Sequence, residues 1–278
     1  MHRIKTFMLM TLLTVVFILL GGMIAGEDGI IMAFGFALVI NFFSYWYSDK
    51  IAIKMTRSEP LKESEAPEIY EMVRELTKKA DLPMPELYLT PSGQPNAFAA
   101  GRNPANAAVA LTKGIINLLD KEELEAVIAH ELSHVKNRDT LISTIAAVMA
   151  GALAFLARMG RFRMLFGGRR GRNKGGALLQ VIALIFAPLA AILIRMAISR
   201  SREYLADQTG AEITGNPEGL ASALQKMQTR VQRNPMKVNE ATSHMFILNP
   251  LSARGMSKLF STHPPVEERI NKLRKQNR

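Results

Sequence analysis

Two long uncharged segments near the amino terminus constrain this chain more than any other feature. Residues 7–25 and 29–47 each run for 19 residues without a charge. A helix needs about 20 apolar residues to span the hydrocarbon core of a bilayer. Trp46 lies between two tyrosines at the end of the second segment, as in the aromatic belt at a membrane–water interface. The sequence therefore predicts a transmembrane helix hairpin within residues 1–47, whose first helix is a retained signal anchor.

The charges that flank this hairpin predict its orientation. Basic residues precede the first segment and follow the second, whereas the connection between them carries only acids. Because cytoplasmic flanks are rich in Lys and Arg, both ends of the hairpin are expected in the cytoplasm. Residues 48–139 would then begin on the cytoplasmic side. The charges are Arg3 and Lys5 before the hairpin, Glu27 and Asp28 within it, and Lys50, Lys54 and Arg57 after it.

A second hydrophobic pair, residues 140–157 and 177–194, has 18 residues in each segment. The loop between them, residues 158–176, carries seven positive charges and no acid, which is most of the chain's net charge of +11. Whether this pair crosses the membrane stays open. Because the seven charges resist translocation, we expect the loop on the cytoplasmic side, near anionic lipid headgroups. Its scarcity of aromatic residues favours a membrane surface over nucleic acid as its partner.

The remaining residues, 48–139 and 199–278, are expected to pack together as one discontinuous cytoplasmic domain, since neither part shows a complete α/β pattern of its own. A β-hairpin is predicted for residues 95–100 and 107–112, around the turn Gly101-Arg102-Asn103-Pro104. The expected fold class is mainly α with a small β-sheet, attached to the transmembrane hairpin of residues 1–47.

One motif indicates metal chemistry. The chain has no cysteine, so any metal must be bound by His, Asp or Glu. Asp120 and Glu123 form a capping box for a predicted helix that carries His130, Glu131 and His134. Residues i and i+4 share one helix face, so both imidazoles can reach one ion, and the glutamate between them can act as a general base. The motif predicts a zincin-type metallopeptidase site with one Zn²⁺ per chain.

A catalytic zinc needs a third protein ligand. Glu203 and Asp207 lie four residues apart on a predicted helix after the second hydrophobic pair. Glu203 could bind the metal while Asp207 accepts the free N–H of a ligand histidine. Spacing alone leaves His244 and His263 as rival ligands.

The order of the motifs adds a resemblance that covers essentially the whole chain. HELSHVKNRDT, a hydrophobic pair, SREYLADQTGAEITGNP and STHPPVEERI follow one another. This series resembles the HtpX family of bacterial membrane-bound zinc endopeptidases, which act in membrane-protein quality control and are related to the CaaX prenyl endopeptidases. The resemblance implies a multi-pass protein of the bacterial inner membrane, with its catalytic domain facing the cytoplasm.

The resemblance also implies roles for individual residues. It makes Glu203 the third ligand beside His130 and His134. It places His263 and Arg269 near the zinc, where they would help to stabilise the oxyanion of the transition state. Asp207 and Asn137 are expected to support the metal ligands from behind. His244 receives no role.

A strand beside the zinc is expected to hold the substrate. In similar enzymes, an edge strand like Asn96-Ala97-Phe98-Ala99 lies next to the metal. An unpaired strand edge can bind an extended polypeptide through main-chain hydrogen bonds, which tolerates many sequences. The alternative is an ordinary hairpin of the domain.

The function expected from these features is zinc-dependent hydrolysis of misfolded or damaged membrane proteins, with Glu131 as the general base for the attacking water. Expected partners are membrane-protein or unfolded polypeptide substrates, the lipid bilayer and other membrane proteases, but no nucleic acid. Two alternatives stay open. One is a membrane scaffold with a structural or inactive zinc site. The other is a membrane-tethered nucleic-acid binder that uses the basic loop of residues 158–176.

Overall fold

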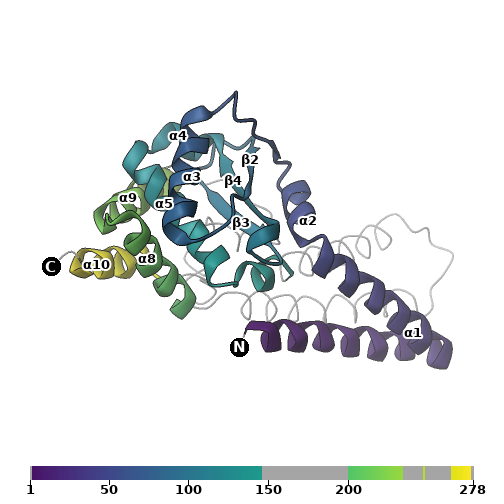
Figure 1. Ribbon diagram of the computed structural model, residues 1–278. Coiled ribbons are helices and arrows are strands. Elements are labelled where there is room, and N and C mark those ends of the chain that lie inside the picture. The colour runs from purple at the N-terminus through teal and green to yellow at the C-terminus, as the bar shows by residue number, and fades with distance from the viewer. Residues whose placement is uncertain (1, 146–199, 234–246, 248–263, 277–278) are drawn as a thin grey trace.

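The chain begins with a helix that doubles back on itself. The computed structural model describes residues 2–145, 200–233, 247 and 264–276 of the protein. Helix α1 (His2–Trp46) reverses direction at Gly26, whose φ of 63° suits glycine. Gly21 leaves no space for a Cβ beside the carbonyl of Gly29, so the two halves lie close together. Figure 1 shows α1 running away from the N-terminus and returning to helix α2.

Side chains from the two halves of α1 contact each other. Asn41 donates a hydrogen bond to Thr14 Oγ1 at 2.9 Å, and the rings of Phe17 and Phe36 meet edge to face with centroids 5.4 Å apart. The reversal thus falls between the two segments predicted from the sequence. Within the described residues, the helix Gly26–Trp46 is long and apolar enough to cross a membrane, and the first half contributes a shorter apolar stretch, Met10–Leu19.

A four-stranded sheet forms the centre of the domain that follows. Its strands are β1 (Glu59–Pro60), β2 (Glu86–Thr90), β3 (Ala97–Gly101) and β4 (Ala107–Thr112), in the order β1-β2-β4-β3. Strand β4 pairs parallel with β2 and antiparallel with β3, which confirms the predicted β-hairpin. Among the described residues, strand β3 is therefore an edge strand of the sheet.

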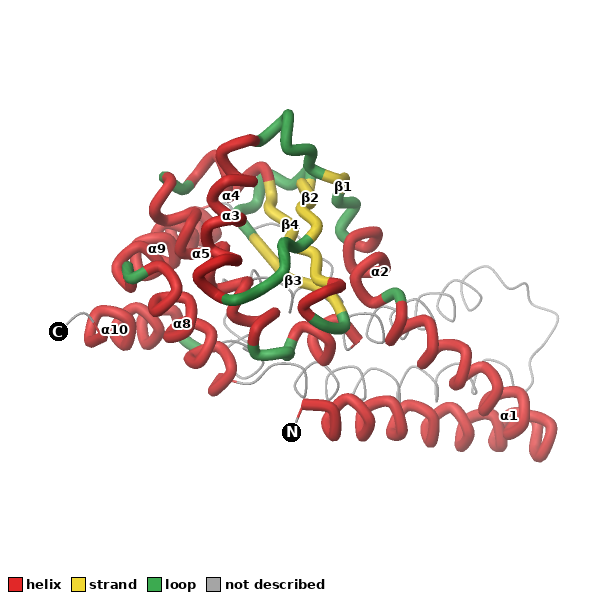
Figure 2. Tube along the Cα trace, in the orientation of Figure 1, coloured by secondary structure: helices red, strands yellow, loops and turns green. Residues whose placement is uncertain are grey.

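One face of this sheet is covered by the continuation of the membrane-type helix. Helix α2 (Ser48–Met55) follows α1 after a break at Tyr47. Its buried residues Ala52 and Ile53 pack in one cluster with Phe98, Ala100, Ala108 and Ala110 of β3 and β4. Because α2 leads directly out of α1, the sheet is attached to the end of the helical hairpin (Figure 2).

The other face of the sheet packs against helices that come from both ends of the chain. A single apolar core joins them, with buried residues such as Leu76, Ile128, Leu224 and Leu273. The remaining helices of the domain are α3 (Pro67–Ala80), α4 (Lys113–Leu118), α5 (Lys121–Lys136), α8 (Arg200–Thr214), α9 (Pro217–Arg233) and α10 (Val266–Gln276). The short 3-10 turn η1 (Pro104–Asn106) lies between β3 and β4. The fold class is mainly α with a small β-sheet, as predicted.

The second hydrophobic pair is described over its first turns alone. Residues 140–145 are helical, and Ile145 is buried in a cluster with Leu13, Phe17 and Ala37 of α1. The start of this segment therefore packs against the helical hairpin. The rest of it, the basic loop 158–176 and the segment 177–194 lie outside the described residues, so their predicted topology stays a prediction.

Candidate metal centre

Helix α5 presents the motif H-E-x-x-H to the interior of the domain. The predicted capping box is present at its start, where Asp120 and Glu123 each accept a hydrogen bond from the other's backbone N–H. Further along the helix, His130 and Glu131 are buried and His134 is partly buried. The two histidine rings lie on one face, with centroids 4.8 Å apart, as their i, i+4 spacing requires.

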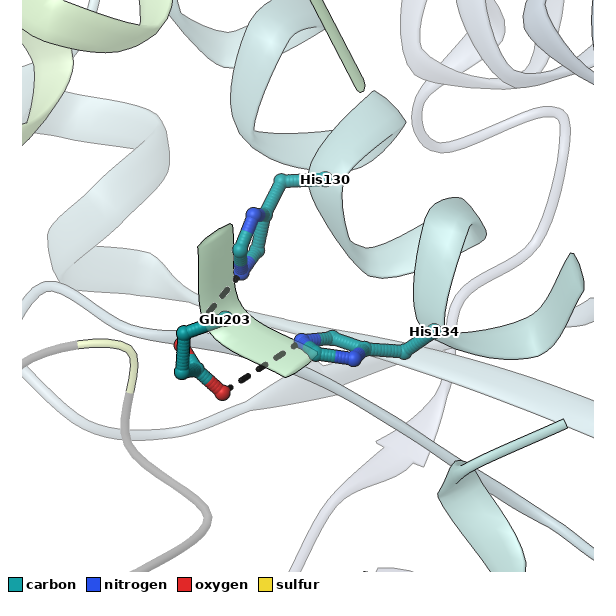
Figure 3. A group of neighbouring side chains, drawn as sticks. All are labelled: His130, His134 and Glu203. Atoms are coloured by element: carbon teal, nitrogen blue, oxygen red, sulfur yellow. Dashed lines mark ion pairs between the residues drawn. The ribbon is translucent and has the colours of Figure 1, made fainter. Parts of the chain in front are cut away.

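Glu203 of helix α8 completes a cluster of three donors. Its carboxylate oxygens lie 3.9 Å from Nε2 of His130 and 3.8 Å from Nε2 of His134 (Figure 3). One ligand atom from each residue lies within 4.8 Å of the others. Two donors with metal bonds of about 2 Å are at most ~4 Å apart, so each atom needs to move by less than about 1 Å to bind one ion. The residues present fit a metal ion.

The other ring nitrogen of each histidine faces a carboxylate. Nδ1 of His130 lies 3.0 Å from Oδ1 of Asp207, and Nδ1 of His134 lies 3.1 Å from Oδ1 of Asp139. Such contacts fix the ring orientation and direct Nε2 toward the metal. Asp207 thus lies beside the ring nitrogen of His130 that faces away from the donor cluster.

Asp139 was missed by the sequence analysis, which proposed Asn137 as a supporting residue. The chain turns back at Arg138, whose φ is 56°, and this turn brings Asp139 under His134. Asn137 instead ends helix α5, and among the described residues its buried side-chain nitrogen has no hydrogen-bond partner. The available signal was an acidic residue five positions after the second ligand histidine.

Arg269 of helix α10 lies behind the ligands and is fully buried. Its Nε and one terminal nitrogen donate to the two oxygens of Asp207 at 2.8 and 2.6 Å. The other terminal nitrogen donates to the carbonyl of Ile247 at 3.2 Å and lies 3.6 Å from Glu203. Burial alone would raise the pKa of Asp207, but the charge of Arg269, its hydrogen bonds and the nearby His130 lower it to about 2. These contacts hold Asp207 ionised beneath His130; the predicted oxyanion role of Arg269 stays a prediction.

The field at the cluster favours a bound cation. Burial alone would lower the pKa of His134, yet the carboxylates of Asp139, Glu203 and Glu131 raise it to about 10. Carboxylates that hold a proton on an imidazole this strongly also attract a metal ion, which competes with that proton for the same nitrogen. The electrostatics therefore agree with the geometry of the donors.

Glu131 lies between the histidines in sequence and faces strand β3. Its Oε2 accepts a hydrogen bond from the backbone N–H of Ala99 at 2.9 Å. Burial raises the pKa of this carboxyl, and the neighbouring histidines oppose that shift. A carboxylate with a raised pKa is suited to accept a proton and release it again.

The residues of the predicted substrate strand have two different orientations. The carbonyl of Asn96 accepts a hydrogen bond from Thr112, so its backbone faces β4 inside the sheet. Backbone groups alternate along a strand, so those of Ala97 and Ala99 face away from β4, on the side where the N–H of Ala99 is bonded to Glu131. Phe98 points its buried side chain toward α2. The Asn96 side chain contacts the backbone N–H of Ile247 at 3.0 Å.

Gly210 allows α8 to approach α5 closely enough to bring the ligands together. A Cβ at this position would lie 3.0 Å from the backbone nitrogen of His130 and 3.1 Å from its Cα. This contact is tighter than ordinary packing, so the glycine sets the separation of the two helices. Sequence reasoning gave Gly210 no role. His244 and His263 lie outside the described residues, and the predicted role of His263 is untested.

The arrangement defines a class of protein. Two histidines one turn apart, a glutamate beside the first and a carboxylate ligand from a second helix form the site of metallopeptidases built on an H-E-x-x-H helix. The chain belongs to peptidase family M48, whose model matches residues 63–277.

Relatives confirm the resemblance that the motifs indicated. The chain is 52% identical over 278 residues to a Protease HtpX homolog of Pelotomaculum thermopropionicum, and the match covers 98% of each chain. It is 52% identical over 277 residues to a Protease HtpX homolog of Thermococcus sibiricus, covering 98% of this chain and 95% of that protein. The crystal structure of S. mikatae Ste24p has a similar fold, with a TM-score of 0.53 and 18% sequence identity. That match covers 98% of this chain and 65% of the Ste24p chain.

Proposed function

We propose that this protein is a membrane-bound, zinc-dependent endopeptidase. The observation that carries the proposal is the position of Glu131, a buried carboxylate that lies beside the donor cluster and contacts an edge strand of the sheet. Two imidazoles and one carboxylate are the ligand set of catalytic zinc in several hydrolases, and such sites leave a fourth position for water. A structural site would instead use four protein ligands.

The residues of the chain then divide the hydrolysis between them. His130, His134 and Glu203 would hold the ion, which would supply a Lewis acid to activate a water molecule and to polarise the scissile carbonyl. Glu131 accepts one proton from the attacking water while the oxygen of that water bonds to the carbonyl carbon. When the C–N bond breaks, Glu131 transfers that proton to the leaving amine. One water is consumed, and a carboxylic acid and an amine are formed. The second proton of the water then passes from the acid to the amine, so a carboxylate and an ammonium group are released.

Strand β3 supplies a site for the polypeptide. The edge-facing backbone groups of Ala97 and the carbonyl of Ala99 can pair with an extended substrate, while the N–H of Ala99 stays bonded to Glu131. Main-chain pairing of this kind depends on an extended conformation and tolerates many sequences. Such tolerance suits the removal of misfolded or damaged membrane proteins and unfolded polypeptides. Other membrane proteases would share this task.

Membrane residence is part of the proposal. The helix Gly26–Trp46 has the length and composition of a membrane span, and it connects directly to the catalytic domain through α2. The basic residues that follow it favour a cytoplasmic position for that domain. We therefore place the protein in the bacterial inner membrane as a multi-pass protein.

The test compares the wild type with Glu131→Gln in detergent, with zinc and a casein-like substrate. The variant should retain zinc, because the three ligands are intact, and lose cleavage by at least about 100-fold, as expected for loss of a general base. Glu122→Gln, which changes an exposed carboxylate on the same helix, is the matched control and should cleave normally. Cleavage by zinc-loaded Glu131→Gln at the wild-type rate would remove this assignment. Absence of cleavage by every zinc-loaded form would favour the alternative of a membrane scaffold with an inactive site.

A further inference from the structure

We infer that this protease selects peptide bonds by their height above the membrane, and that it cleaves segments within about seven extended residues of the bilayer surface. The inference rests on the proposed function and adds a substrate class to it. It comes from contacts that tie the active-site edge of the sheet to the end of the membrane-type helix.

The end of that helix marks the level of the membrane surface. The apolar span closes at Trp46, whose side chain is 46% exposed, and Tyr47 beside it is 42% exposed. Trp and Tyr collect at the boundary between hydrocarbon and water. The charged residues Asp49, Lys50 and Lys54 follow within the next two turns. Trp46 therefore lies at the interface.

Arg102, in the turn after β3, binds Trp46 at the end of this helix. One terminal nitrogen of its guanidinium donates to the carbonyl of Trp46 at 2.9 Å, and the guanidinium carbon lies 4.8 Å from the centre of the indole ring. The other terminal nitrogen donates to Oδ1 of Asn106 at 2.9 Å. A cation over an indole face and a hydrogen bond to the same residue give one contact both strength and direction.

Two further contacts hold the same strand. On its buried face, Phe98 and Ala100 of β3 pack against Ala52 and Ile53 of α2. At its end, Thr140 donates from Oγ1 to the carbonyl of Gly101 at 3.0 Å, and Thr140 begins the second hydrophobic pair. Strand β3 is thus attached to both membrane-type regions of the chain. A strand held at three points cannot change its height without breaking buried contacts.

The distance from this joint to the catalytic carboxylate is short. Ala99, which donates to Glu131, precedes Arg102 by three residues, or about 10 Å of strand. With the length of the Arg102 side chain and the two hydrogen bonds of 2.9 Å at either end added, Glu131 lies within ~23 Å of the level of Trp46, a span that about seven extended residues cover. A substrate segment that leaves the bilayer close by reaches the edge of β3 within that length. A bond held farther away would require the catalytic domain to separate from α1.

The experiment uses the full-length zinc-loaded protein in vesicles of phosphatidylethanolamine and phosphatidylglycerol. The probe is a single-span helix that carries a proline-rich rod and then an unstructured cleavable segment. Rods of about 5, 10 and 15 residues place that segment roughly 15, 31 and 46 Å above the end of the span. Soluble casein is the second substrate and reports the proposed function itself. The test variant is Arg102→Ala. The matched control is Lys54→Ala, which also removes one positive charge, from an exposed position on α2.

The wild type should cleave the tethered probe with no rod, and at least about tenfold more slowly with the longest rod, because that rod cannot span to the site. Arg102→Ala should reduce this ratio and retain casein cleavage, whereas Lys54→Ala should keep the ratio. Equal wild-type rates at every rod length would overturn the inference. Cleavage of casein without cleavage of any tethered probe would also overturn it. Both results would leave the proposed function intact. Failure to cleave casein as well would count against the proposed function.

Discussion

Removal of the Arg269 guanidinium should destabilise the protein before it affects the chemistry. In Arg269→Met the carboxylates of Asp207 and Glu203 would stay buried, but Asp207 would lose both of its charged hydrogen bonds, at 2.8 and 2.6 Å. Removal of one partner from a buried ion pair costs about 3–5 kcal/mol, because an uncompensated charge is left in the interior. For a domain of this size, about 2–4 °C per kcal/mol converts this cost to a Tm lower by ~6–20 °C.

The assay is thermal unfolding of the metal-free protein in detergent with a chelator, so that a change in metal binding does not contribute to Tm. The double variant Asp207→Asn, Arg269→Met should recover part of the loss, since it removes the buried charge together with its partner. Arg274→Met is the matched control on the same helix. Arg274 pairs with Glu218 at 2.8 Å on the surface, where solvent screens the pair, and its loss should change Tm little.

A different result would refute this reasoning. If Arg269→Met melts with the wild type while its kcat falls by about 100- to 1,000-fold, Arg269 stabilises a developing oxyanion and is not a support for Asp207. Hydrogen-bond donors at an oxyanion act in the transition state and leave the stability of the resting enzyme unchanged.

Three further predictions concern the metal and its support. Glu203→Ala should lower the zinc content measured by mass spectrometry of the purified protein, whereas Glu212→Ala, an exposed position on the same helix, should not; equal zinc in both would assign the third ligand elsewhere. Asp139→Asn should weaken zinc binding by the 10–100-fold typical of lost support for a ligand histidine, measured by competition with a chelating dye, and unchanged affinity would contradict the role given to Asp139. Gly210→Ala should lower the free energy of unfolding by about 1–3 kcal/mol, because its Cβ would press on the backbone of His130; unchanged denaturant unfolding would show that α8 can move away freely.

Local features of this protein could be predicted because neighbours in the sequence decide them. The helix over Lys121–Lys136 follows from its capping box and its apolar spacing, and its two histidines share a face whatever surrounds them. The hairpin of β3 and β4 follows from a turn between two short segments of suitable residues. The reversal at Gly26 follows from the acids and glycine between two apolar runs.

The sequence identified fewer of the contacts between distant parts of the chain. Spacing left Glu203 as one of several possible third ligands, and the resemblance to a family narrowed the choice. Its place between the two imidazoles depends on the packing of α8 on α5, which a glycine with no motif of its own permits. The position of Asp139 under His134 depends on a left-handed turn at Arg138. An arginine in the sequence does not predict this conformation, which is uncommon for residues other than glycine.

The sequence by itself determined the H-E-x-x-H helix, the apolar helical hairpin at the amino terminus and the strand pair, since each depends on residues within one or two turns or one hairpin. The tertiary structure alone decided which residues from distant parts of the chain contact these elements. Arg269 supports Asp207 because α10 packs next to α8, and Arg102 meets Trp46 because α2 lies against the sheet. Such contacts join residues far apart in the chain, and they depend on how apolar faces pack together, which no local pattern encodes.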